Sequence, residues 1–255
     1  MKMQRTREHR LEHRTEQQYR VPGAVGERLR RTIVSEVLLL FLVLFLPGML
    51  MVEDSVEIEL FDHLGFHLSY GIVAIPQILL ILHVIKSRPE IWAREFGIRR
   101  LRLPDALWAA LLIPVLFGAL AVVLGLAFAL QQIGVDISMP HGAGFRLTRP
   151  ELLPLVAITS LLTGYREELF FRAYMLPRLG QAGVRVPHAV AVSTTLFAVG
   201  HIYQGAVGLL FAAVIGVVLS FAFYRRRSVH HIGLAHAAYN FLSLVFTLAA
   251  EANLG

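Results

Sequence analysis

The chain contains no cysteine and few charged residues. The absence of cysteine among its 255 residues excludes disulfide frameworks and any thiolate nucleophile or metal ligand. Charged residues make up 16% of the chain, whereas a soluble domain of this length carries about 25%. Hydrophobic residues make up 56%, and the mean hydropathy is +0.61. This composition predicts an all-α, polytopic transmembrane protein.

Several apolar runs approach or exceed the roughly 20 residues that a helix needs to cross a bilayer core. They predict a bundle of about seven membrane spans, within a range of six to eight. The fifth span is short and its link to the sixth is very short, so a re-entrant or strongly tilted pair is an alternative there. The expected spans are residues 32–52, 67–86, 106–130, 152–176, 187–202, 206–224 and 231–250.

Basic residues are distributed unevenly between the expected loops. The segments 1–31, 86–105, 177–186 and 225–230 hold 20 Lys and Arg residues, and the segments on the opposite side hold 2. By the positive-inside rule, this asymmetry places the N-terminus in the cytoplasm and the C-terminus outside. Because topology accounts for the net charge of +6 and the pI near 10, we expect no nucleic-acid partner. The Leu-, Ala- and Arg-rich composition favours a bacterial plasma membrane.

The chain divides into a tail and a membrane domain. Residues 1–31 mix acidic and basic side chains and contain few large apolar ones, which predicts a basic cytoplasmic tail without stable structure. Residues 32–250 form the expected helical domain, and its polar clusters fall at about residues 150–245. A small transporter or proton relay would carry inverted repeats, and we find no internal repeat in the sequence.

Four charged residues interrupt the fourth expected span: Arg166, Glu167, Glu168 and Arg172. A central Asp, Lys or Arg costs roughly 2.5–3.5 kcal/mol on insertion scales, so this segment must face a protein interior or a wet cavity. Glu168 and Arg172 are four residues apart, which favours an ion pair. Glu167 lies about 100° round the helix axis and can project separately into the bundle. The two acids can thus take different protonation roles, or all four charges can form one structural salt-bridge cluster.

Two histidines lie in later spans. His201 follows Gly200, whose small size lets water, a helix or a substrate backbone approach closely. His236 and Asn240 are four residues apart on one helical face, where they can donate hydrogen bonds to an oxyanion or bond a neighbouring helix. Residue counts place Glu167 and both histidines at similar depths, so tilted helices can bring their side chains together.

Three motifs occur in order within apolar helices: Glu-Glu-x-x-x-Arg at 167–172, Phe-x-x-x-His at 197–201 and His-x-x-x-Asn at 236–240. This order resembles the CPBP family of intramembrane proteases, which includes CAAX prenyl endopeptidases of the Rce1 type and bacterial abortive-infection-type relatives. The resemblance covers roughly residues 150–245. It implies an endopeptidase that hydrolyses peptide bonds within the bilayer, near its cytosolic face.

The resemblance also implies roles for individual residues. Glu167 would be the catalytic carboxylate that acts as general base on water, and His201 would help to activate that water. His236 and Asn240 would stabilise the tetrahedral oxyanion. The implied partners are the lipid bilayer and a peptide or protein substrate, lipidated or not.

A supporting ion pair and a possible metal ion are the remaining features of the implied site. Glu168 and Arg172 would form a pair that fixes the orientation of Glu167. No His-Glu-x-x-His motif occurs, yet Glu167, His201 and His236 can supply three zinc ligands with an open fourth position. General base catalysis without a metal is the favoured alternative. A non-proteolytic protein of the same fold, acting as an immunity factor or binding partner, is the competing function; its polar clusters would only hold helices together.

Overall fold

The computed structural model describes residues 26–50, 60–87, 95–135, 137 and 146–252, and this part of the chain contains helices and no strand. Residues 1–25, most of the expected tail, lie outside it, and the first described helix begins at Glu27. The α-helices are α2 (Glu27–Leu50), α3 (Leu64–Lys86), α4 (Leu103–Gln132), α5 (Leu153–Glu168), α6 (Leu176–Gln181), α7 (Val186–Val199), α8 (Gly205–Arg226) and α9 (Val229–Ala252). Short 3₁₀ turns are η1 (Leu60–Asp62), η3 (Pro150–Leu152) and η5 (Ile202–Gln204), and η4 (Leu169–Met175) is a π-helix.

The prediction of an all-α membrane protein with about seven spans is confirmed. Five helices are long and apolar enough to cross a membrane, namely Glu27–Met49, Leu64–Lys86, Leu103–Gln132, Ile202–Arg226 and Val229–Ala250. The segment α5–η4–α6 forms the expected fourth span, whose charged residues lower its hydropathy. Helix α7 is the expected short fifth span, with 14 residues.

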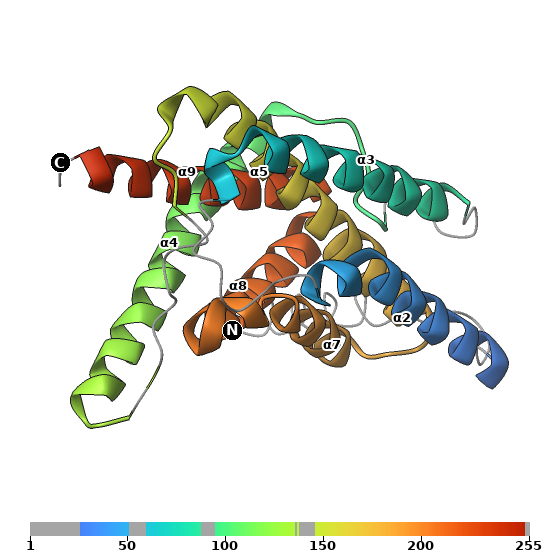
Figure 1. Cartoon of the computed structure of the whole chain (residues 1–255). Coiled ribbons are helices and arrows are strands. Elements are labelled where there is room, and N and C mark those ends of the chain that lie inside the picture. The colour runs from blue at the N-terminus through green and yellow to red at the C-terminus, as the bar shows by residue number, and fades with distance from the viewer. Residues whose placement is uncertain (1–25, 51–59, 88–94, 136, 138–145, 253–255) are drawn as a thin grey trace, which may run out of the picture.

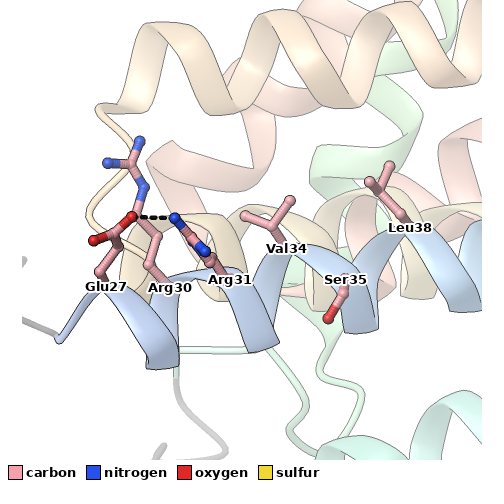
Figure 2. Close-up of a pocket in the computed structure, with 6 residues that line it drawn as sticks. All are labelled: Glu27, Arg30, Arg31, Val34, Ser35 and Leu38. Atoms are coloured by element: carbon pink, nitrogen blue, oxygen red, sulfur yellow. Dashed lines mark hydrogen bonds and ion pairs between the residues drawn. The ribbon is translucent and has the colours of Figure 1, made fainter.

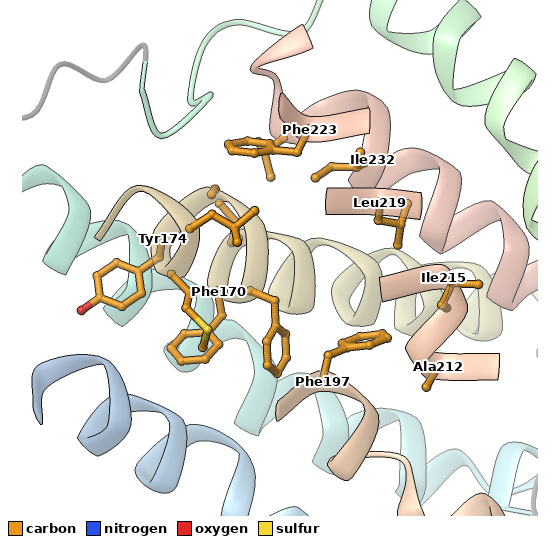
Figure 3. Packing of buried hydrophobic residues seen from close by; sticks show 14 of the residues in the cluster. Phe170, Tyr174, Phe197, Ala212, Ile215, Leu219, Phe223 and Ile232 are labelled. Carbon is orange, nitrogen blue, oxygen red and sulfur yellow. The ribbon is translucent and has the colours of Figure 1, made fainter. Parts of the chain in front are cut away.

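Helix α5 packs against α9 and α3, while α4 packs against α9 and α8, and α7 lies beside α8 (Figure 1). Aromatic side chains fill the space around η4, as Figure 3 shows. Among the fully or almost fully buried members of this core are Phe170, Tyr174, Phe197, Leu219, Phe223 and Ile232. The charged end of α5 therefore faces the protein interior, as the four charged residues of this segment predicted.

The π-helix η4 begins immediately after Glu168, where the sequence predicted a regular helix. All of its seven side chains are buried, and Ser193 of α7 donates a hydrogen bond of 2.8 Å to the carbonyl of Phe171. A wider π turn changes which faces of the segment successive side chains occupy. Such turns are frequent at functional sites, and this one follows the two adjacent acids directly.

A glycine allows the closest contact between α5 and α9. A Cβ added at Gly164 would lie 2.7 Å from the backbone nitrogen of Ala237 and 2.8 Å from the carbonyl oxygen of Gly233. Both atoms belong to the backbone and cannot rotate away. Small residues of this kind let membrane helices approach each other closely. Since α9 carries His236, this approach also sets the distance between the acids and the histidine.

We expect Gly164→Ala to lower the free energy of unfolding by about 1–3 kcal/mol, because the two helices must move apart. Thermal unfolding in detergent is the measurement. The matched control is Gly118→Ala in α4, since an added Cβ there meets nothing within 4 Å. An equal effect of the two substitutions would contradict the close approach of α5 and α9.

Candidate active site

Two adjacent acids at the end of α5 have different surroundings. Glu168 is fully buried, and its Oε1 accepts hydrogen bonds from Arg172 Nη1 and from His236 Nδ1, both at 2.9 Å. The ion pair expected from the four-residue spacing is therefore present. Glu167 is 7% exposed and takes no part in that pair. His236 lies against both acids, 2.9 Å from Glu168 Oε1 and 3.8 Å from Glu167 Oε2.

Arg172 connects several helices from its position in η4. Its side chain is fully buried, and besides Glu168 it donates a bond of 3.3 Å to the carbonyl of Gly216 in α8. Its guanidinium lies 4.4 Å from the ring centroid of Phe197 in α7, within the range of a cation–π interaction. Together with His236, the Glu168–Arg172 pair thus joins α5, α7, α8 and α9.

The Glu167 carboxylate has one oxygen that makes no hydrogen bond to the described residues. Its Oε1 is 3.4 Å from Arg166 Nη2, and its Oε2 lies 3.8 Å from His236 Nε2. That Oε2 is buried and lacks a hydrogen-bond partner within the described part of the chain. Buried polar atoms are nearly always satisfied, so an exception needs an explanation. The free oxygen is available to water or to a substrate group.

Both histidines have a defined tautomer. His201 follows α7, and its Nδ1 lies 2.8 Å from the carbonyl oxygen of Phe197. Because a carbonyl only accepts, this nitrogen carries the proton and Nε2 of the neutral ring is the basic atom. The same reasoning applies to His236, whose Nδ1 faces the Glu168 carboxylate. In each neutral ring, Nε2 is the nitrogen left for chemistry.

The His201 ring is packed between aromatic side chains. Its centroid lies 4.6 Å from that of Phe197 and 6.3 Å from that of Tyr203, to which it is nearly parallel. The Phe197 ring also lies 6.0 Å from the His236 ring, so one aromatic side chain contacts both histidines. The Phe-x-x-x-His spacing therefore brings a ring and an imidazole together on one side of α7.

Asn240 lies one turn beyond His236 on α9 and is half-buried. Its amide forms no hydrogen bond with any residue that the structure describes. The structure thus brings Glu167, Glu168, Arg172 and His236 into direct contact or close proximity. His201 adjoins this group through Phe197, and Asn240 adjoins it on the same face of α9.

The suggested zinc set is not assembled. Glu167, His201 and His236 have suitable donor types, but within the described ranges no three His, Cys, Asp or Glu side chains lie close enough to hold a metal ion. The present arrangement therefore does not fit a three-ligand zinc site, and no chemical step below is assigned to a metal.

Sequence reasoning missed the surroundings of Arg166. Its Nη1 donates to Gln77 Oε1 at 3.2 Å, and its guanidinium lies 5.2 Å from the Phe45 ring and 5.3 Å from the Tyr70 ring. These partners belong to α2 and α3, far from the three motifs. The only sequence signal was the presence of single polar residues, Tyr70 and Gln77, inside an apolar span.

The structure also has a hollow of about 500 Å³ beside α2, away from the acids and histidines. Figure 2 shows the ion pair between Arg31 and Glu27 at its end. Both of these side chains are largely exposed, and such surface pairs contribute little to stability. The lining residues are Glu27, Arg30, Arg31, Val34, Ser35 and Leu38, so none of the expected site residues faces this hollow.

Comparison with known proteins gives one match. Residues 149–242 match the family model described as type II CAAX prenyl endopeptidase Rce1-like. No curated protein and no solved structure matches this chain. The resemblance found in the sequence is confirmed over this segment, which contains all six expected site residues: Glu167, Glu168, Arg172, His201, His236 and Asn240.

Proposed function

We propose that this integral membrane protein, whose residues 149–242 carry an Rce1-like domain, is an intramembrane endopeptidase that uses Glu167 as its general base. The observation that supports this most directly is the free Oε2 of the buried Glu167 carboxylate, 3.8 Å from His236 Nε2. A carboxylate held by one oxygen leaves the other free to accept a proton from water. Glu168 Oε2 is likewise unpaired within the described residues, but Glu168 Oε1 accepts from both Arg172 and His236, so the charge of Glu168 is already balanced by that buried pair.

The proposed reaction uses one water molecule. Glu167 Oε2 accepts a proton from the water, assisted by His201 Nε2, and the water oxygen bonds to the carbonyl carbon of the substrate. The carbonyl oxygen becomes an oxyanion, stabilised by donors from His236 and Asn240. The C–N bond then breaks, and the proton on Glu167 passes to the leaving amine nitrogen. The products are a carboxylic acid and an amine, and the acid then releases its remaining proton to water.

The bond between His236 and Glu168 defines one requirement of this scheme. Because Nδ1–H of His236 is directed at Glu168, the ring can donate to an oxyanion only through Nε2–H. His236 must therefore carry both protons when it plays this role. Asn240 has no such requirement, since its amide always has N–H donors.

The substrate we propose is a membrane-associated peptide or a protein tail, with or without a prenyl group. The distribution of basic residues supports a cytoplasmic N-terminus, with the site nearer the cytosolic face, and the Leu-, Ala- and Arg-rich composition favours a bacterial plasma membrane. The competing role is that of a non-proteolytic immunity factor or binding partner. The Glu168–Arg172 ion pair favours this non-proteolytic role, because the pair also joins helices.

The test is peptidase activity of the purified protein in detergent on quenched peptides, one of which is prenylated. Wild type, Glu167→Gln and His201→Ala are compared, each with and without a chelator. Cleavage that both substitutions remove supports the proposal, and a chelator effect on wild type would assign a role to a metal. Cleavage that survives both substitutions would contradict the proposed site. No cleavage of any peptide by wild type would favour the non-proteolytic role.

Asn240→Ala separates oxyanion stabilisation from folding. We expect kcat to fall roughly 10²–10³-fold, because one donor to the oxyanion is lost. Stability should not change, since the amide makes no hydrogen bond to a described residue. Steady-state kinetics and thermal unfolding of the same preparation test both statements. A lower unfolding temperature with unchanged kcat would make Asn240 a structural residue instead.

A further inference from the structure

Arg166 is held in place from several sides. Gln77 of α3 accepts from its Nη1, and the Gln77 amide nitrogen in turn donates to the carbonyl of Leu44 in α2 at 2.9 Å. This amide is therefore fixed at both ends, with its oxygen directed at the guanidinium. The rings of Phe45 and Tyr70, within about 6 Å of the cation, add the geometry of cation–π contacts.

The Tyr70 ring is itself held by a hydrogen bond. Thr163, one turn before Glu167 on α5, donates a hydrogen bond of 2.7 Å to the hydroxyl of Tyr70. Helices α3 and α5 thus contact each other through two successive polar pairs, Thr163–Tyr70 and Arg166–Gln77. The guanidinium therefore occupies a defined position, and its side chain is only 15% exposed.

The fixed position of the Arg166 guanidinium affects Glu167. Arg166 Nη2 lies 3.4 Å from Oε1 of Glu167, while Oε2 has no hydrogen-bond partner in the described structure and lies 3.8 Å from His236 Nε2. A fixed cation beside Oε1 holds the carboxylate in one orientation and leaves Oε2 as the reactive oxygen. Arg166 therefore acts on the general base, Glu167, and not on the substrate.

We propose that Arg166 is a positioning residue for the general base, and that Gln77, Phe45 and Tyr70 hold it there. Helices α2 and α3, which lie outside the matched segment 149–242, then complete the active site. The inference rests on the proposed function, because it concerns the base of that reaction. The competing role for this cation is binding of a substrate carboxylate.

The test observes the Glu167 carboxylate directly. Infrared difference spectra between each protein and its Glu167→Gln partner, recorded at one pH, give the symmetric and antisymmetric carboxylate stretching bands of Glu167. In Arg166→Gln the separation of the two bands should change, because the charged donor beside Oε1 has been removed. Arg166→Lys should reverse most of the change, and Gln77→Leu should produce a smaller change in the same direction. Gln77→Leu also serves if Arg166→Gln does not fold.

Arg178 provides a matched control. It is a second buried arginine, 5% exposed in its side chain, and it pairs with Glu36 of α2 at 2.9 Å. Arg178→Gln removes a buried ion pair without touching Glu167, so it should lower stability and leave the carboxylate bands of Glu167 unchanged. Unchanged bands in Arg166→Gln, or an equal change in Arg178→Gln, would overturn the inference.

Kinetics separate this inference from the proposed function. If wild type cleaves peptides, kcat should fall by about tenfold or more in Arg166→Gln while KM stays nearly unchanged, because the base is no longer held in place. A rise in KM limited to substrates with a free C-terminal carboxylate, and absent for amidated ones, would assign Arg166 to substrate binding and overturn the positioning role. If wild type cleaves nothing, the proposed function fails while the infrared bands still decide the effect of Arg166 on Glu167.

Discussion

Replacement of Glu167 by glutamine should remove peptide cleavage while the protein remains folded in the membrane. Loss of a general base typically lowers the rate roughly 10²–10⁴-fold, and glutamine has nearly the same shape but cannot accept a proton. The substitution disturbs few contacts. Glutamine Oε1 can still accept from Arg166 Nη2, and the atom that replaces Oε2 had no hydrogen-bond partner in the described structure.

Glu168→Gln is the matched control for this experiment. The two residues are adjacent, both are buried, and the chemical change is identical. Glu168, however, is paired with Arg172 at 2.9 Å, so its replacement leaves a buried cation without its counter-charge. We therefore expect Glu167→Gln to lose activity at nearly full stability, and Glu168→Gln to lose stability. Rates and unfolding temperatures measured on both proteins decide this, and the reverse pattern would exchange the roles of the two acids.

The local part of this site could be predicted from the sequence because helical spacing is a local property. Glu168 and Arg172 are four apart on one helix, which alone predicts their contact. The depth of each motif within its span predicted that Glu167 and His236 can meet, and the two side chains lie 3.8 Å apart. Their catalytic roles remain proposals, since geometry shows what can react and not what does.

The parts that the sequence did not reveal depend on packing between distant segments. Gln77 is a single polar residue in an apolar helix, and no spacing rule connects it with Arg166, which lies 89 positions later. The π-helix after Glu168 is equally hidden, because Leu169–Met175 has the composition of an ordinary buried helix. The tautomer of His201 depends on a local contact with the carbonyl of Phe197, four residues earlier, but the sequence does not fix the rotamer that makes this contact.

Replacement of Arg172 by methionine should have the largest effect on stability. Both Arg172 and Glu168 are fully buried, so the substitution leaves a carboxylate in the interior without its cation. Breaking a buried pair in this way typically costs about 3–5 kcal/mol. Methionine retains the long apolar stem and can still contact Phe197, so the loss reports mainly on charge. Thermal unfolding in detergent and the amount of protein in the membrane are the measurements.

The double substitution Glu168→Gln with Arg172→Met tests the cause. If the single substitution destabilises because a charge is stranded, removal of that charge should recover most of the stability, since buried pairs can often be replaced by neutral groups at little cost. Glutamine at 168 can still accept from His236 Nδ1, so the histidine stays oriented. Activity should then return with stability. A double variant as unstable as Arg172→Met would instead place the importance of Arg172 in its contacts with Gly216 and Phe197.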